Sequence, residues 1–407
     1  MKSSISTRIA TSALFAALAM PAQITAQEQS ATQEENADHV RYSIIDLGAV
    51  GNPPGQPYVL NKDGLIAGAA AIPDGAMHAF VWYKRLKVDI GAPGLGGPNS
   101  AAFGINENGQ VVGQAETSDP NGEDFCGFHA YGFPSSTACR AFLLQDGVMN
   151  TLPTLGGANG VANMINNRGE TVGYAEKNTR EKGCPVSQFE PVIWKDGAIN
   201  ELHTYPGDPD GVAAWINDSG QIAGSSGTCA PAFNQNTGLY LVENHALLWE
   251  KDGSVHDLGS LGGAGGLAGN HACALNNRSQ VVGHSELPND TTFHGFLWTK
   301  ETGMQDLGTL PGDFASLALG INDRGEVVGA SLNATFTTSR AFIWKDGVMT
   351  QLSALIRGSS GLSLQEAVSI NSRGEIVGLG ATASGEPHAF LATPCDGDHA
   401  DAESCKD

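Results

Sequence analysis

The stretch INDRGEVVG, residues 321–329, decides the fold of this chain because it is one of seven copies of a single phrase. Each copy has an aliphatic residue and Asn, a short turn, two mostly apolar residues and a Gly. The other six are LNKDGLIAG from Leu60, INENGQVVG from Ile105, INNRGETVG from Ile165, INDSGQIAG from Ile216, LNNRSQVVG from Leu275 and INSRGEIVG from Ile370. Their starts lie 45 to 60 residues apart. A period of this length, built from β-branched residues and Gly turns, indicates a β-propeller rather than a helical solenoid.

Two more phrases occupy fixed places in the repeat. An apolar phrase follows the first, as in HAFVW from His78 and RAFIW from Arg340, and a third closes most units, as in DLGSLGG from Asp257. Each unit therefore offers four short strands, here called a, b, c and d, separated by Gly, Asn and Asp turns. Four strands joined by tight turns make one blade. We predict an all-β fold over residues 41–394, a seven-bladed β-propeller of four-stranded blades.

The two ends of the repeat predict how the ring closes. The chain begins its repeats with YSIIDLG from Tyr42, which matches strand d with no a, b or c before it. It finishes with HAFLA from His388, a strand c with no d after it. The N-terminal strand is therefore expected to be the outer strand of the seventh blade. Such closure removes two exposed sheet edges and stabilises the ring.

The repeat resembles the HAF-repeat family, a group of extracellular repeat proteins named for the His-Ala-Phe that begins strand c. The residues that carry the resemblance are His78-Ala79-Phe80, His388-Ala389-Phe390 and the Asp-Leu-Gly-Ser-Leu-Gly-Gly that starts at Asp257. The resemblance implies secretion and a repeat fold but no defined activity, so no functional residue follows from it. The chain departs from the family pattern at Arg140, Pro191, Ser279 and Arg340.

The segments outside the repeats have their own signatures. Residues 1–26 combine Lys2 and Arg8 with a short apolar run and end at Ala26, the layout of a secretory signal peptide. Residues 27–40 are polar and acidic and are expected to form a flexible leader, while residues 395–407 form a C-terminal tail. No stretch of the sequence reaches the 18 or so apolar residues that a membrane helix needs. We therefore expect a protein secreted to the periplasm or the extracellular medium.

The charge balance limits the partners. The chain has 43 acidic and 22 basic residues, and losing Lys2 and Arg8 with the signal changes the formal charge from −21 to −23. So negative a surface repels nucleic acid, which needs basic patches. It suits neutral glycans or basic proteins, or serves solubility alone. We expect a monomer with no cofactor and no metal, since Asp208-Pro209-Asp210-Gly211 lacks the later ligands of a calcium loop.

Seven cysteines are an odd number for a compartment that permits disulfides. Cys126 and Cys139 bracket one insertion, Cys184 and Cys229 lie in insertions of neighbouring blades, and Cys395 and Cys405 flank the tail. We predict these three pairs as disulfides. Cys273 is left over inside the apolar phrase HACALN and is expected to be a free, buried core thiol.

The connections between strands b and c vary most and indicate where function lies. Between the strand-b Gly and strand c they contain 9 or 10 residues in blades 1, 5, 6 and 7, but 26, 17 and 20 in blades 2, 3 and 4. Long loops grouped on one face of a rigid scaffold are a usual place for a binding surface. The a–b turns keep one length and are interpreted as structural, with Asn as a hairpin residue that tolerates positive φ. The strand-c His is interpreted as a repeated structural hydrogen bond.

The lengthened loops and the links beside them carry aromatic, His and Arg side chains suited to a ligand site. The predicted ligand-binding residues are Phe128, His129, Tyr131, Arg140, His203, Tyr205, Tyr240 and His245. The favoured function is recognition of an extracellular glycan or protein. The alternatives are a lyase-like, polysaccharide-cleaving enzyme with a Tyr, His and Arg site on the same face, and simple packing of the aromatics into a satellite core.

Overall fold

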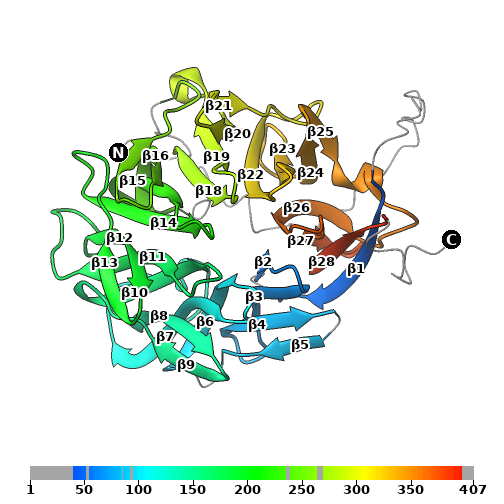
Figure 1. Cartoon of the computed structure of the whole chain (residues 1–407). Coiled ribbons are helices and arrows are strands. Elements are labelled where there is room, and N and C mark those ends of the chain that lie inside the picture. The colour runs from blue at the N-terminus through cyan, green and yellow to red at the C-terminus, as the bar shows by residue number, and fades with distance from the viewer. Residues whose placement is uncertain are drawn as a thin grey trace, which may run out of the picture.

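A computed structural model describes residues 40–51, 55–84, 86–91, 95–234, 239–263 and 269–396, and leaves the side chains of residues 231–240 undescribed. It confirms the predicted all-β fold, because seven four-stranded antiparallel sheets stand as blades in a ring (Figure 1). The predicted signal peptide (1–26), almost all of the leader (27–40) and most of the tail lie outside the described residues. No helix in the described part of the chain is long and apolar enough to cross a membrane.

Each sheet is ordered a, b, c, d from the inside of the ring outwards. Blade 1 contains β2 (Pro57–Leu60), β3 (Leu65–Ala71), β4 (Met77–Tyr83) and β5 (Leu86–Asp89). Blade 2 contains β6 (Gly96–Ile105), β7 (Val111–Pro120), β8 (Thr137–Gln145) and β9 (Val148–Thr151). Blade 3 contains β10 (Gly156–Ile165), β11 (Thr171–Lys177), β12 (Phe189–Lys195) and β13 (Ala198–Glu201). Blade 4 contains β14 (Asp210–Ile216), β15 (Ile222–Asn234), β16 (Leu239–Trp249) and β17 (Val255–Asp257).

The remaining blades follow the same order. Blade 5 contains β18 (His271–Leu275), β19 (Val281–Glu286), β20 (Phe293–Thr299) and β21 (Gly303–Asp306). Blade 6 contains β22 (Ala315–Ile321), β23 (Val327–Leu332), β24 (Ser339–Lys345) and β25 (Val348–Gln351). Blade 7 contains β26 (Ser363–Ile370), β27 (Ile376–Ala381), β28 (Pro387–Pro394) and, from the other end of the chain, β1 (Tyr42–Ala49). Two single 3₁₀ turns, η1 (Pro288–Asp290) and η2 (Leu352–Leu355), lie between strands.

The ring closes as predicted. Strand β1 pairs antiparallel with β28, from Tyr42 opposite Pro394 to Ala49 opposite His388. The backbone amide of Arg357 also donates a hydrogen bond of 2.8 Å to the carbonyl of Tyr42, which ties β1 to the neighbouring blade. The first repeat strand therefore completes the last blade and covers the edge that β28 would otherwise expose.

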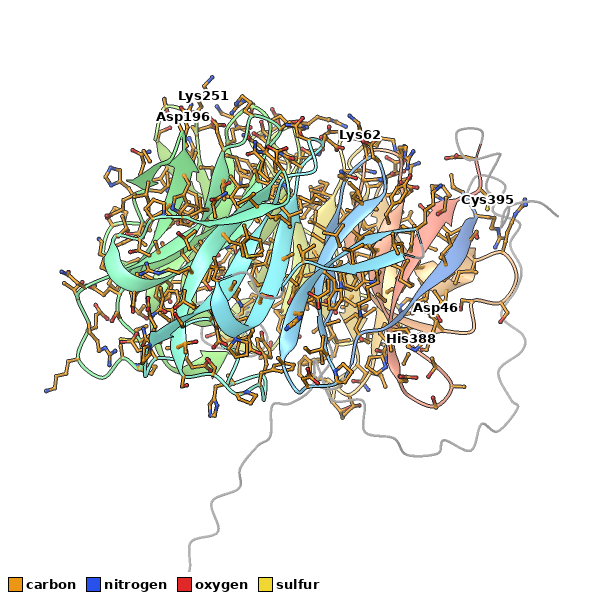
Figure 2. All side chains as sticks on the ribbon, turned by 90° about the horizontal axis from the view of Figure 1, so that it is seen from below. Asp46, Lys62, Asp196, Lys251, His388 and Cys395 are labelled. Atoms are coloured by element: carbon orange, nitrogen blue, oxygen red, sulfur yellow. A yellow bond between two sulfur atoms is a disulfide. The ribbon has the colours of Figure 1, made fainter. Side chains whose placement is uncertain are left out.

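The connections divide between two faces. In side view, Lys62 in the a–b turn of blade 1 lies on one face with Asp196 and Lys251 in c–d turns of blades 3 and 4 (Figure 2). His388, at the start of strand c of blade 7, and Asp46, its partner on strand d, lie towards the opposite face. We call these the turn face and the loop face. The long b–c connections belong to the loop face, as the sequence predicts.

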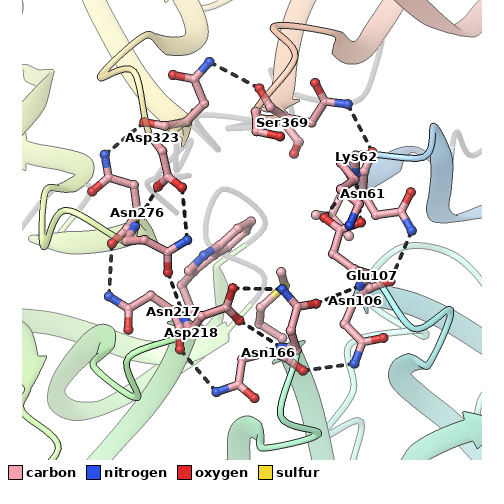
Figure 3. Close-up of a pocket in the computed structure, with 18 of the residues that line it drawn as sticks. Asn61, Lys62, Asn106, Glu107, Asn166, Asn217, Asp218, Asn276, Asp323 and Ser369 are labelled. Carbon is pink, nitrogen blue, oxygen red and sulfur yellow. Dashed lines mark hydrogen bonds between the residues drawn. The ribbon is translucent and has the colours of Figure 1, made fainter.

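The Asn of every a–b turn forms part of a closed ring (Figure 3). Its Oδ1 accepts backbone N–H bonds from the residues two and four positions later, as Asn61 does from Asp63 at 3.1 Å and Leu65 at 2.9 Å. Its Nδ2 donates to the carbonyl of the same Asn in the next blade. The seven donors, at 2.9 to 3.2 Å, are Asn61, Asn106, Asn166, Asn217, Asn276, Asn322 and Asn371, the last of which donates back to Asn61.

This ring corrects the interpretation of the Asn as a residue chosen for positive φ. The positive φ falls three positions later, as at Gly64 (80°) and Gly325 (81°), and also at Ser279 (61°), where Gly is replaced. The Asn itself is needed because a single amide both closes its own turn and bridges to the neighbouring blade. Asn is suited to this because its short side chain carries an acceptor and a donor together.

The innermost strand of every blade carries a one-residue bulge, three positions before the ring Asn. The bulged residue has no partner on strand b and is partly exposed, although its neighbours are buried in every blade except blade 4, where Trp215 is also partly exposed. Because strand a is the inner edge of each blade, we call the space that these side chains border the central channel. They are Tyr58, Phe103, Asn163, Ala214, Cys273, Leu319 and Val368.

Candidate functional site

The b–c loop of blade 2 folds around its own small core. Phe125, Phe128 and Phe133 are at most 4% exposed, and the predicted disulfide between Cys126 and Cys139 is present. The Phe125 ring packs edge-on against Phe189 of blade 3, with 5.7 Å between ring centres. A loop this long needs its own apolar core because ordering its backbone costs about 1–2 kcal/mol per residue. Phe128, predicted to contact a ligand, is therefore a packing residue, which matches the satellite-core alternative.

The other predicted residues of this loop differ in exposure. Tyr131 is half-buried against the same core, and burial raises the pKa of its hydroxyl above the ordinary value. His129 is exposed, and its backbone amide donates to the Asp124 carboxylate at 2.9 Å. Arg140 lies within the next strand, β8, and is partly exposed; its guanidinium donates to Thr154 Oγ1 at 3.3 Å. The loop thus presents His129 and the edge of Arg140 to solvent.

The three lengthened loops are joined to one another. Glu123 of loop 2 accepts hydrogen bonds from the backbone amide (3.0 Å) and hydroxyl (3.1 Å) of Ser187 in loop 3. Its carboxylate also forms an ion pair with Arg180 of loop 3. Loop 3 is linked to blade 4 by the predicted disulfide between Cys184 and Cys229. Covalent and polar cross-links therefore hold the loops of blades 2, 3 and 4 as one unit.

A second cluster lies where the link before blade 4 meets strand c. The rings of Tyr205 and His245 stack with their centres 3.8 Å apart and their planes at 21°. His245 Nδ1 lies 2.8 Å from Asp208 Oδ2, and the Ser226 hydroxyl donates to the same oxygen at 2.6 Å. His203 is exposed, although its carbonyl accepts a 2.6 Å bond from the indole of Trp249. The structure thus brings Tyr205 and His245 together, with His203 two residues away along the chain.

His245 departs from the pattern of its repeat. In blades 1, 5 and 7 the strand-c His pairs with the Asp of strand d in its own blade, at 2.7 to 2.9 Å. These are the repeated structural hydrogen bonds that the sequence predicts. In blade 4 the strand-d residue Asp257 keeps the turn bond that its counterparts also accept, here from the amide of Gly259, but the strand-c His contacts a different carboxylate. His245 Nδ1 lies against Asp208, and its ring stacks on Tyr205.

The predicted residues therefore form two groups rather than one pocket. Among the described residues, the contacts join Tyr205 to His245, whereas Tyr131 packs with the core of loop 2 and Arg140 bonds to Thr154. The side chain of Tyr240 lies outside the described residues. For the lyase alternative, three of the basic side chains that could bind an anionic substrate are held by carboxylates: Arg180 by Glu123, Lys177 by Glu190 at 2.8 Å and Arg340 by Asp313 at 2.8 Å. These contacts do not build a basic cleft around a Tyr or His base.

A cavity of about 310 Å³ opens at the centre of the turn face (Figure 3). The Asn ring surrounds it, and Met164, Trp215 and Leu275 are among the apolar residues that line it more deeply. Its rim consists of the residues that follow each ring Asn, namely Lys62, Glu107, Asn167, Asp218, Asn277, Asp323 and Ser372. The rim therefore carries three carboxylates and one amine, and burial raises the pKa of Glu107 above the ordinary value.

A second tier of hydrogen bonds runs along this rim. The backbone amide of each rim residue donates to the side chain of the next, from Lys62 to Glu107 and on to Asp323, at 2.8 to 3.1 Å. Sequence reasoning interpreted this face as structural and missed the cavity. The available signal was that seven Asn residues at identical places must converge on the axis of a closed propeller.

Comparisons with known proteins give only a distant likeness. No family model matches the chain, and no curated protein matches it. The WD40 β-propeller domain of Doa1 is similar over 87% of this chain and 97% of its own, at 12% identity and a TM-score of 0.40. TolB from Acinetobacter baumannii is similar over 87% of this chain but 63% of its own, at 9% identity and a TM-score of 0.34.

A mutant of the lectin from Aleuria aurantia, solved in complex with Fucα1-6GlcNAc, is similar over 86% of this chain and 91% of its own. Its identity is 8% and its TM-score 0.32. Scores this low carry no argument about what the present chain binds. The resemblance to the HAF-repeat family therefore stays a prediction, and the function has to be argued from this chain's own residues.

Proposed function

We propose that this chain is an exported recognition module, which binds an extracellular glycan or protein through the loop face of blades 2, 3 and 4. The observation that carries this proposal is the cross-linking of the three lengthened loops. Two disulfides and the Glu123 contacts fix loops that a propeller does not need for its own closure. Fixing a binding surface in advance lowers the entropy lost when a partner binds.

The contact residues in this proposal are those that the structure leaves accessible. His129 is exposed on loop 2, and His203 and the stacked pair of Tyr205 and His245 lie at the edge of blade 4. Phe128 and Tyr131 hold the loop from inside. The acidic character of the chain favours a neutral glycan or a basic protein surface as ligand.

The test compares variants at the same strand-c His position in two blades, His245 in blade 4 and His388 in blade 7. The triple variant His203→Ala, Tyr205→Ala, His245→Ala should lose at least tenfold in affinity for a ligand found by glycan array or by a panel of purified extracellular proteins. The matched control is His388→Ala, which removes the same strand-c position in blade 7, where His388 pairs with Asp46. Equal affinity of the triple variant and the wild type would contradict the proposed surface.

The loops themselves are tested by replacing all three with nine-residue connections of the kind found in blades 1 and 7. Circular dichroism should still show a folded β-protein, and binding should be lost. Export is tested separately by sequencing the N-terminus of the protein recovered outside the cytoplasm. We expect it to begin at Gln27, and a mature protein that begins at Met1 would contradict the signal peptide.

A further inference from the structure

Cys273 is in a different environment from the one its sequence suggests. It is the bulged residue of β18 and therefore a partly buried member of the central channel, not a fully buried core thiol. Its thiol is free, as predicted, whereas the other described cysteines are all in disulfides. A free thiol beside accessible space can meet a small reagent, whereas one packed in a core cannot.

Two imidazoles lie beside this thiol, and a carboxylate is paired with one of them. His284, opposite His271 on the neighbouring strand β19, has its Nδ1 4.0 Å from the sulfur. The rings of His271 and His284 are stacked with their centres 5.5 Å apart. Glu243 reaches across from blade 4 and pairs with His271 Nδ1, which also lies 3.0 Å from Ser225 Oγ. Cysteine, histidine and an orienting carboxylate are thus assembled at the interface of two blades.

The buried carboxylate of Glu243 is a second observation that packing alone does not explain. It is 1% exposed, and its Oε2 has no hydrogen-bond partner among the described residues. Burying a carboxylate in this way is unfavourable unless a positive charge lies beside it. A protonated His271 supplies that charge, and a thiolate at Cys273 favours its protonation in turn.

The ionisation of the group agrees with this geometry. Burial alone would raise the pKa of the Cys273 thiol, but the adjacent His271 and His284 outweigh it and lower the value from 9.0 to about 6. Burial would lower the pKa of His271, but the charges of Glu243 and Cys273 raise it well above 6.5. Burial, and then the charge of Cys273, raise the pKa of Glu366 in blade 7 to about 7. Glu286, also buried, accepts a bond from the amide of Gly269 at 3.0 Å.

We propose that Cys273 is a nucleophilic thiolate site, oriented by His271 and Glu243, that forms a mixed disulfide with low-molecular-weight disulfides. The sulfur of Cys273 attacks one sulfur of the small disulfide R–S–S–R, forming a new S–S bond. The old S–S bond breaks and R–S⁻ leaves, so the Cys273 sulfur is oxidised, the leaving sulfur is reduced, and the small disulfide is itself the oxidant. The proton of the thiol already resides on His271, which stays cationic beside Glu243.

Access to the site is from the turn face. The cavity within the Asn ring reaches Leu275 on β18, two residues from Cys273. Two residues span about 7 Å along a strand. A small reagent in this cavity therefore lies about two residues along β18 from the sulfur.

The experiment measures the rate at which the purified protein is alkylated by iodoacetamide, by intact mass, as a function of pH. The rate should rise with a midpoint near pH 6, as the lowered pKa requires. At pH 6.5 it should exceed that of free N-acetylcysteine by about fivefold, since greater ionisation outweighs the lower nucleophilicity of an acidic thiol. Cystine should then add one half-cystine per chain, and the Cys273→Ser variant should add none.

Variants assign the role of the neighbours. His271→Gln and, independently, Glu243→Gln should move the midpoint up by more than one pH unit, while His388→Gln on the loop face should leave it unchanged. Thermal unfolding identifies any variant that does not fold. If neither His271→Gln nor Glu243→Gln folds, the pH profile of the wild type alone tests the proposal. A wild-type midpoint near 8.5, labelling only after denaturation, no reaction with cystine, or an unmoved midpoint in folded His271→Gln would each overturn the proposal.

Discussion

The Asn ring should be the most sensitive element of the fold, and Asn322→Ala tests it. Asn322 is 4% exposed, and its side chain makes four hydrogen bonds. Its Nδ2 donates to Glu326 at 2.7 Å and to the carbonyl of Asn371 at 3.2 Å. Its Oδ1 accepts the backbone amides of Arg324 at 3.0 Å and Glu326 at 3.1 Å. All four are lost in the alanine variant.

The size of the effect follows from these contacts. A net contribution of about 1 kcal/mol for each bond gives a loss of about 4 kcal/mol in the free energy of unfolding. For a domain of this size that corresponds to a fall in Tm of about 5 °C. Glu326 remains paired with Arg324 at 2.8 Å and Lys345 at 3.2 Å, so the variant does not also leave a carboxylate unpaired.

The matched control is Asn333→Ala. Asn333 also accepts a backbone amide through Oδ1, from Thr337 at 3.0 Å, but its bonds stay within one exposed turn and cross no blade interface. Urea unfolding followed by circular dichroism should show a loss of about 1 kcal/mol or less for this control. The reasoning is wrong if the two variants lose the same stability.

A third variant separates the donor from the acceptor. Asn322→Asp keeps the acceptor oxygen but replaces the amide donor with a carboxylate beside Glu326 and the Asn371 carbonyl. Two like charges in contact are unfavourable, so this variant should be as unstable as the alanine variant at neutral pH. Acidification should restore part of the difference, because a protonated carboxyl can donate. An aspartate variant as stable as the wild type would show that the inter-blade bond contributes nothing.

Three further predictions follow from the structure. Deleting residues 27–48 should lower the Tm sharply because β28 loses its pairing with β1, and an unchanged Tm would contradict the closure. Mass mapping of the non-reduced protein should find three disulfides and a free Cys273; the bridges are Cys126–Cys139, Cys184–Cys229 and Cys395–Cys405, the last residue lying outside the described structure. Burial would raise the pKa of Glu170, but Lys195, Asn166 and Arg168 outweigh it and lower the pKa to about 2. The contribution of Glu170 to the free energy of unfolding is therefore complete above pH 4.5 and lost as the pH falls towards 2. Urea unfolding of Glu170→Gln should show a shallower decline in stability over that window than the wild type.

The fold could be predicted because the same strand and turn pattern occurs in seven copies along the chain. Seven equivalent phrases fix the number of blades, and the unpaired phrases at Tyr42 and His388 fix the closure. The disulfides within and between the long loops were predictable for the same reason, since the repeat identifies which blades are neighbours. Contacts between repeats were less visible. The role of the ring Asn depends on seven side chains meeting at one axis, and a local turn preference does not reveal that.

The candidate site was predicted only in part, for two physical reasons. Long loops need their own core, so the aromatic residues that suggested a ligand site, Phe128 above all, are used for packing. A bulge also changes which face of a strand a side chain occupies, because side chains alternate along the strand. That is why Cys273, within an apolar phrase, borders the central channel instead of the core.

The places where the repeat is broken are the places where chemistry gathers. A structural position in this fold is one that every blade fills alike, as the ring Asn shows, and the strand-c His with its strand-d Asp repeats in blades 1, 5 and 7. His245 abandons its strand-d partner for Asp208, and Cys273 occupies a channel position that the other blades fill with Tyr, Phe, Asn, Ala, Leu and Val. Each departure replaces a stable repeated contact with a less ordinary one, a stacked His-Tyr pair in the first case and a thiol between two imidazoles in the second. Folding alone does not require either substitution, because the remaining blades form without them. Blades 4 and 5 are therefore where mutations should alter function while leaving the ring intact.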